Sequence, residues 1–153
     1  MPFFYLDTES YSTIRIENGL DQYMTGADNL ITTFCGETGP VKVWDRLSGE
    51  RMPNEFEDNL LDERVTKVAH NAQFDHNLIN VSPGIETPVD QWWCTMAQAY
   101  AHGLPGSLEA LGPVVGIPND MQKMAEGKKL IQLFCVPYKG KPRDRDWETL
   151  IKL

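Results

Sequence analysis

Two carboxylates follow the first apolar run of the chain. Residues from Phe3 to Leu6 are apolar or aromatic and lead directly into Asp7-Thr8-Glu9. Such a run predicts a buried strand, in which residues two apart share a face, so Asp7 and Glu9 should project side by side. Neighbouring carboxylates repel each other unless a cation lies between them, and Mg²⁺ and Mn²⁺ prefer oxygen ligands. These residues permit a metal site at a strand end, although a solvated acidic turn is the simpler interpretation of them alone.

A third carboxylate, Asp75, could join this pair. Residues 65–69 predict a short strand, and a helix is expected from Ala72 to about residue 79. In such a helix Asn71 and Asp75 would lie on one face, four residues apart. If the short strand pairs beside the first one, Asp75 approaches Asp7 and Glu9. Three carboxylates at one sheet edge can hold two divalent ions, which stabilise the attacking and leaving oxygens of a phosphoryl displacement.

The remaining elements must position these side chains. Further strands are predicted at 30–35 and 41–44, and further helices at 53–61, 96–102, 108–115, 128–135 and from 147 onward. Residues 10–28 show only turn signals. The order of strand, hairpin, helix, strand and then mostly helices predicts an α/β domain with a small mixed sheet.

Composition excludes several classes of protein. The chain has 153 residues, 41% hydrophobic and 24% charged, which suits one globular domain. No apolar run is long enough to span a membrane, so no membrane partner is expected. The three cysteines form no Cys-x-x-Cys pair, which disfavours structural zinc and disulfides and favours a cytoplasmic setting. The net charge of −8 disfavours generic binding to phosphate backbones, although residues 123–153 are net basic and could hold a strand.

The two acidic segments resemble a known pair of motifs. Leu6-Asp7-Thr8-Glu9, followed about sixty residues later by His70-Asn71-Ala72-Gln73-Phe74-Asp75, resembles the first two motifs of the DnaQ-like (DEDD) 3′–5′ exonuclease superfamily. Residues 92–96 and 106–111 look most like the proofreading domain of bacteriophage-type family A DNA polymerases. The resemblance implies a ribonuclease H-like fold, with a five-stranded mixed sheet flanked by helices. It also implies an exonuclease that removes nucleotides from single-stranded or frayed DNA 3′ ends with Mg²⁺ or Mn²⁺.

Roles follow from the resemblance by position. Asp7 would bridge both metals, Glu9 would ligate the tighter metal and touch the terminal nucleotide, and Asp75 would hold the second metal. Three further residues would form the substrate site around the terminal nucleotide: Thr8, Asn71 and Phe74. The resemblance also implies a polymerase domain of the same parent chain as partner, and the cytoplasm of a bacterial or phage-infected cell as location.

One motif of the superfamily has no counterpart here. Its last helix carries Tyr-x-x-x-Asp or His-x-x-x-x-Asp, which supplies a fourth carboxylate, and neither pattern follows Asp75. We therefore expect residues 1–153 to be an exonuclease domain that is incomplete at its C-terminal helix, lacks the polymerase domain and turns over slowly. Two alternatives stay open. One is a non-catalytic nucleic-acid-binding or structural front of a DNA polymerase, and the other is an RNase D-like exoribonuclease.

Overall fold

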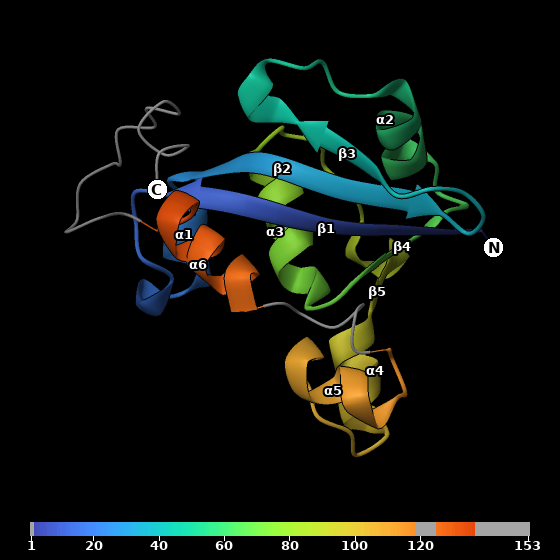
Figure 1. Cartoon of the computed structure of the whole chain (residues 1–153). Helices are drawn as coiled ribbons and strands as arrows, with labels where there is room; N and C mark the ends of the chain where they lie inside the picture. Colours follow the sequence, from blue (N-terminus) through green and yellow to red (C-terminus); the bar gives the residue numbers. More distant parts are fainter. Residues whose placement is uncertain (1, 119–124, 137–153) are drawn as a thin grey trace.

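Five strands form one mixed sheet at the centre of the molecule (Figure 1). The computed structural model describes residues 2–118 and 125–136. In sheet order the strands are β3 (Lys42–Asp45), β2 (Ala27–Gly36), β1 (Phe3–Ser12), β4 (Thr66–Ala69) and β5 (Trp92–Cys94). The β1–β2 and β2–β3 pairs are antiparallel, whereas β4 runs parallel to both β1 and β5. The predicted small mixed sheet is therefore confirmed.

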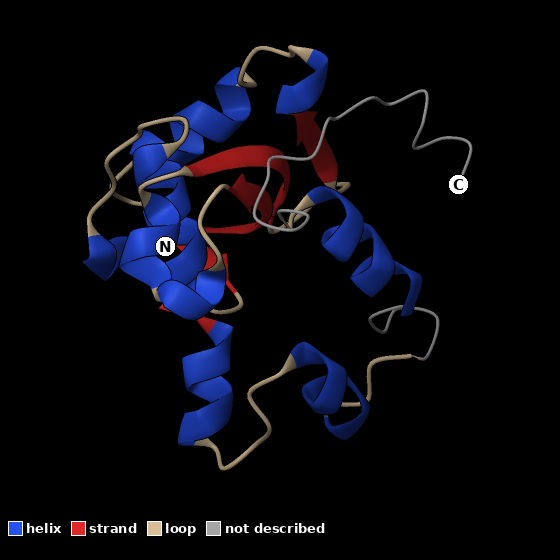
Figure 2. Cartoon of the chain, turned by 90° about the vertical axis from the view of Figure 1, so that its left-hand side faces the viewer, coloured by secondary structure: helices blue, strands red, loops and turns tan. Residues whose placement is uncertain are grey.

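Helices lie on both faces of this sheet. The α-helices are α1 (Leu20–Met24), α2 (Asn54–Leu61), α3 (Ala72–Val81), α4 (Thr95–Ala101), α5 (Leu108–Val114) and α6 (Ala125–Phe134), and the short 3-10 turns are η1 (Ile16–Asn18), η2 (Arg46–Ser48) and η3 (Val89–Gln91). Figures 1 and 2 show α3 on one face and α6 on the other, with α4 and α5 projecting beyond β5. Within the described ranges, no helix has both the length and the apolar character needed to cross a membrane.

The main core lies between the sheet and helices α2 and α3. Phe56 of α2 is fully buried and packs among three aromatic rings of the sheet. The ring centroids of these residues lie 5.1, 5.7 and 5.9 Å from that of Phe56: Phe34, Trp44 and Phe4. Ile79 of α3 joins the same cluster. The apolar half of β1 therefore fixes α3, the helix that carries Asp75.

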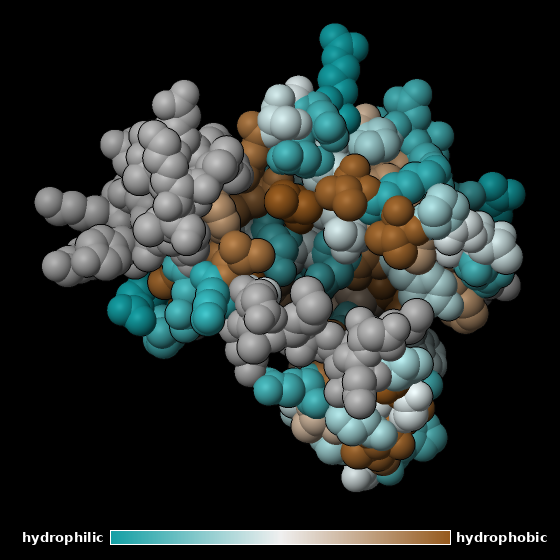
Figure 3. All heavy atoms as spheres, in the orientation of Figure 1, coloured by the Kyte–Doolittle hydropathy of each residue, from teal (hydrophilic) through white to brown (hydrophobic). Residues whose placement is uncertain are grey.

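The other face of the sheet keeps apolar side chains at the surface. Phe3, Tyr5 and Val43 are 41%, 42% and 57% exposed, and the Phe3 and Tyr5 rings lie 6.4 Å apart. Apolar surface is visible over the middle of the sheet in Figure 3. This face of the sheet also carries the side chains of Asp7 and Glu9, because successive strand residues alternate between faces.

Substitutions in α3 should lower the stability of the protein more at a buried position than at an exposed one. Ile79→Val removes one methylene from a side chain that is 0% exposed, which should lower the free energy of unfolding by about 1 kcal/mol. Val81→Ala is the control on the same helix, since Val81 is 50% exposed and alanine favours a helix. Urea unfolding measures both variants. Equal losses would contradict the packing of Ile79 described above.

Several elements differ from the sequence-based expectations. β1 continues past Glu9 to Ser12 because β2 pairs with it over that whole length, with a bulge between Glu9 and Ser10. The strand β5 and the helix α1 were not predicted, since three residues and five residues give almost no periodic signal. The predicted helix from residue 147 lies outside the described residues.

Candidate active site

The face of β1 that meets α3 changes from apolar to polar along its length. Phe4 and Leu6 are followed on that face by Thr8, Ser10 and Ser12, all buried. The hydroxyls of Ser10 and Tyr23 lie 2.7 Å apart, and the Ser12 hydroxyl donates to the carbonyl oxygen of Tyr23 at 2.8 Å. Buried hydroxyls need such partners. The C-terminal half of β1 and helix α1 thus build a polar end to the core.

Asp75 is bound at this polar end by both donors of Thr8. Its Oδ1 accepts the Thr8 backbone N–H at 3.0 Å and the Thr8 hydroxyl at 2.7 Å. β4 pairs with β1 only at Phe3, Phe4 and Tyr5, so the Thr8 amide lies past the end of that pairing. The carboxylate of Asp75 takes the position on the edge of β1 that a longer β4 would occupy.

Burial and a neighbouring charge favour the neutral form of Asp75. The side chain is 3% exposed, and desolvation is the main cause that raises its pKa to about 7. The Thr8 hydroxyl lowers this pKa, and the negative charge of Asp7 raises it further. The charge of Asp7 thus acts on a carboxylate from a distant part of the chain.

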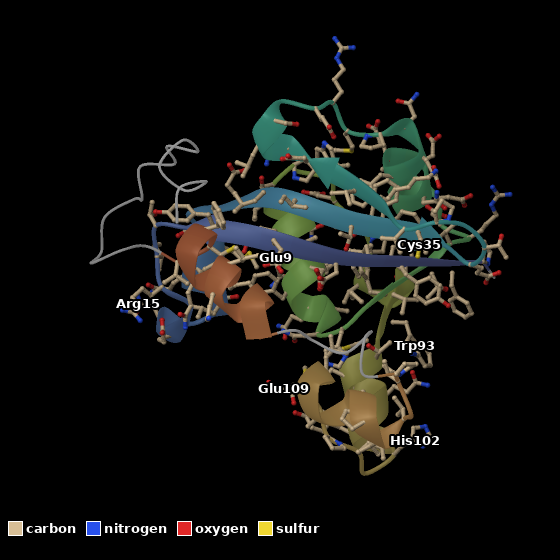
Figure 4. All side chains as sticks on the ribbon, in the orientation of Figure 1. Glu9, Arg15, Cys35, Trp93, His102 and Glu109 are labelled. Carbon is tan, nitrogen blue, oxygen red and sulfur yellow. The ribbon has the colours of Figure 1, made fainter. Side chains whose placement is uncertain are left out.

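Asp7 and Glu9 project to the opposite face from Thr8. Asp7 is exposed and pairs through its backbone with Thr33 of β2, whereas Glu9 is half-buried. The Cys135 thiol donates to Glu9 Oε2 at 3.8 Å, because the C-terminal end of α6 crosses this end of β1 (Figure 4). The expectation that Asp7 and Glu9 share one face is confirmed by the alternating burial of β1.

The three carboxylates are not arranged as metal ligands. In the part of the chain that the structure describes, no group of three or more His, Cys, Asp or Glu side chains could hold a metal ion. The expected convergence of Asp7, Glu9 and Asp75 on two ions is therefore not seen. The donor chemistry does suit a hard cation, since carboxylate oxygens are the ligands of Mg²⁺ and Mn²⁺. The charge of Asp7 also disfavours the ionised form of Asp75, and a cation between the two carboxylates would offset this repulsion.

A pocket of about 220 Å³ adjoins Glu9, whereas Asp7 and Asp75 are not among the residues that line it. Thr8 and Glu9 line it on one side, Tyr23 and Phe74 form a second wall, and the end of α6 closes it. The rings of Tyr23 and Phe74 lie 5.8 Å apart. Of the residues expected around a terminal nucleotide, Thr8 and Phe74 line this pocket.

Asn71 is placed differently from the sequence-based expectation. It precedes α3 with a φ of 67° and is exposed, so the interpretation that it shares a helical face with Asp75 is wrong. Asparagine tolerates this left-handed conformation better than most residues. The Asn71 carbonyl accepts the Phe74 N–H at 2.8 Å, and the residue therefore sets the turn through which the chain enters α3.

His70, which precedes this turn, has a structural role. Its Nε2 lies 2.7 Å from the Gly106 carbonyl oxygen and its Nδ1 lies 3.0 Å from the Thr95 hydroxyl. A carbonyl can only accept, so Nε2 carries a hydrogen, and in the neutral ring Nδ1 accepts from Thr95. Both ring nitrogens are thus used to join β4 to the segment around α4.

The sequence does not identify most of the residues that line the pocket, including Tyr23, Arg15 and Cys135. Tyr23 lies in the stretch 10–28, where only turn signals are expected. Cys135 is the last residue of the helix expected at 128–135, whose position relative to the site the sequence does not give. Tyr23 is buried, and burial is the main cause that raises its pKa. An aromatic residue between two turn signals was the only available indication, and it does not specify a partner.

No family model matches the chain. Over 137 residues it is 31% identical to a DNA polymerase of Bacillus phage SP02, a match that covers 88% of this chain and 21% of the polymerase. The chain is thus a distant homologue of a phage DNA polymerase, of which it spans about a fifth.

Two solved structures share the fold. NrnC of Brucella melitensis has a TM-score of 0.58 at 15% identity, and NrnC with bound Mg²⁺ has a TM-score of 0.57 at 16% identity. Each match covers 80% of this chain and 56% of the other. The five-stranded α/β fold is therefore ribonuclease H-like, as in NrnC, and the fold implied by the sequence motifs is confirmed.

Proposed function

We propose that Asp7, Glu9 and Asp75 form the catalytic centre of a metal-dependent 3′–5′ exonuclease that acts on DNA 3′ ends, as the proofreading module of a DNA polymerase. One observation carries this proposal. Asp75 is bound by the amide and hydroxyl of Thr8, the residue between Asp7 and Glu9, across 67 positions of sequence. The homologous polymerase supports DNA as the substrate, and the related fold in NrnC with bound Mg²⁺ supports a hard cation.

Each residue of the site would have its own role. Mg²⁺ or Mn²⁺, when bound, would supply an activated water and neutralise charge on the leaving oxygen. Asp7 and Glu9 would hold the cations on the exposed side of β1, and Asp75 would complete the ligands from its edge. Phe74 and Tyr23 would pack against the terminal nucleotide in the pocket.

Thr8 has a role in addition to the substrate contact that the resemblance implies. Both of its donors bind Asp75, so we assign it to the positioning of that carboxylate. A carboxylate held by two hydrogen bonds has few accessible rotamers. Pre-organised ligands lower the cost of assembling a catalytic site.

One observation favours a second candidate. The described carboxylates do not form a group that could hold a metal, which suits a domain that binds nucleic acid without cutting it, or that only begins a polymerase structurally. The two functions differ in one measurable respect, because only the first releases nucleotides when a divalent cation is added.

Removal of metal tests the proposal directly. The protein is incubated with 5′-labelled single-stranded DNA and, in parallel, with RNA of the same sequence, in Mn²⁺ or in EDTA. We expect a ladder that shortens stepwise from the 3′ end of DNA in Mn²⁺, and no products in EDTA. Binding without products in either buffer would establish the non-catalytic function, and faster shortening of RNA would establish the exoribonuclease.

A further inference from the structure

Arg15 brings a positive charge to the pocket beside the carboxylates. It follows β1 in an extended conformation and immediately precedes η1. It lines the same pocket as Thr8 and Glu9, and Figure 4 shows Arg15 and Glu9 on either side of α6 at the same end of the sheet. Among the described residues that line this pocket, Arg15 is the only Lys or Arg, and Glu9 and Glu17 are the acidic residues.

The guanidinium of Arg15 forms a weak ion pair with Glu17. Arg15 Nε and Nη2 donate to the two oxygens of Glu17 at 3.2 and 3.1 Å. The side chains of this ion pair are 62% and 64% exposed, and exposed pairs of this kind contribute little to stability because solvent screens them. The same two donors match the geometry of a phosphate. The replacement of Glu17 by a phosphate as the partner of Arg15 therefore costs little free energy.

A polyanionic strand needs such a cation at this place. Residues 1–122 carry most of the negative charge of the chain, and the pocket itself contains Glu9 and Glu17. Phosphates that approach these carboxylates are repelled unless positive groups compensate. A cation bound by Asp7 and Glu9 would compensate at the scissile bond, and Arg15 lies where it can compensate along the strand.

We propose that Arg15 binds a backbone phosphate of a single strand whose 3′ end occupies the pocket, and that Glu17 holds the guanidinium in the absence of the strand. The proposal rests on the proposed function, since it takes the occupant of the pocket to be a nucleic-acid end. Arg15 is a positioning residue: it fixes the register of the strand relative to the carboxylates and takes no part in bond breaking.

The chain offers a closely matched control. Arg64 forms the same kind of pair, with Asp62 two residues away, through Nε and Nη2 at 2.9 and 2.7 Å. Arg64 is exposed and is not among the residues that line the pocket. Arg64→Gln therefore removes one equivalent surface charge from a different place.

Salt dependence of strand binding provides the test. Fluorescence anisotropy with a 5′-labelled oligothymidylate in Ca²⁺ gives the dissociation constant of the full chain at several salt concentrations. Arg15→Gln should reduce the slope of log affinity against log salt by about 0.7, the value for one phosphate on a single strand, whereas Arg64→Gln should leave the slope unchanged. Glu17→Gln should tighten binding by about 2- to 5-fold, because it frees the guanidinium.

The outcomes separate this proposal from the proposed function. An unchanged slope in Arg15→Gln, in a protein that still shortens DNA, would overturn the role of Arg15 alone. If Arg15→Gln and Arg64→Gln lowered the slope equally, the effect would come from net charge alone, and the role of Arg15 would be overturned as well. A wild-type protein that does not bind the strand would overturn both proposals, and one that binds with an Arg15-dependent slope but never shortens DNA would overturn only the nuclease.

Discussion

Asp75→Asn should make the protein more stable at pH 8 in EDTA, by up to about 4 kcal/mol, and should abolish exonuclease activity. The first effect follows from the pKa of Asp75, which is about 7 in the folded protein against an ordinary value of 3.8. Each pH unit of such a shift corresponds to about 1.4 kcal/mol. The folded state binds the proton more tightly than the unfolded chain, so stability falls as the pH rises from about 4 to about 7 and is lowest above that range.

Asparagine removes this cost without removing the local contacts. The Thr8 amide and hydroxyl both donate to the single atom Oδ1, and the amide oxygen of asparagine can accept both hydrogen bonds. The variant has no carboxylate to desolvate and no repulsion from Asp7. It also has no charge to offer a divalent cation, and we therefore expect the loss of activity to accompany the gain in stability.

Urea unfolding at pH 5 and pH 8 in EDTA measures the effect. The wild type should be less stable at pH 8 than at pH 5, and Asp75→Asn should show little difference between the two. Asp58→Asn removes an exposed carboxylate of α2 and should preserve the wild-type pH dependence. Thr8→Val should steepen it, since the Thr8 hydroxyl lowers the pKa of Asp75. A wild type that gains stability from pH 5 to pH 8 would contradict the described burial of Asp75.

Two sequence-level expectations about the site depended on strong local rules. Alternation in a strand placed Asp7 and Glu9 on one face, and the uninterrupted run Phe3–Leu6 made the strand clear. The approach of Asp75 followed from a short strand that leads into a helix, because parallel neighbours bring their C-terminal ends together. Local periodicity was sufficient for the first of these statements, because it depends on a single element. The approach of Asp75 also required that the short strand pair beside the first one, as β4 does with β1.

Other features of the site depend on tertiary partners, which periodicity does not specify. Asn71 adopts a left-handed conformation in the turn between β4 and α3. A buried carboxylate such as Asp75 needs hydrogen-bond donors, but the sequence does not show that Thr8 supplies two of them. The three-residue strand β5 exists because β4 pairs with it, and three residues alone give no periodic signal for a strand.

The polar half of β1 connects stability to the proposed chemistry. Thr8, Ser10 and Ser12 are buried and hydrogen-bonded, at positions where valine or isoleucine would add hydrophobic stabilisation. Buried polar groups of this kind are common at functional sites, where local stability is reduced for the sake of geometry. The desolvation of Asp75 likewise reduces local stability, and a bound cation would offset this cost.

Asp7→Asn should remove the response of the protein to divalent cations and lower the rate of DNA shortening by at least about 10³-fold. A cation held by carboxylates stabilises the folded state, by about 2.7 kcal/mol at a concentration 100 times its dissociation constant. In a domain of this size that raises the melting temperature by about 5–10 °C. The rate effect corresponds to about 4 kcal/mol of transition-state stabilisation, within the range of metal-ion catalysis.

The same substitution should have the opposite effect when no cation is present. The charge of Asp7 raises the pKa of Asp75, so its removal lets Asp75 ionise at lower cost and should stabilise the protein at pH 8 in EDTA. Differential scanning fluorimetry with and without Mn²⁺ measures both effects in one experiment, with Asp58→Asn as the control that retains the wild-type response. A shift in Mn²⁺ that persists in Asp7→Asn would place the cation elsewhere, whereas loss of the shift together with a higher melting temperature in EDTA is the combination that only a carboxylate site at Asp7 and Asp75 produces.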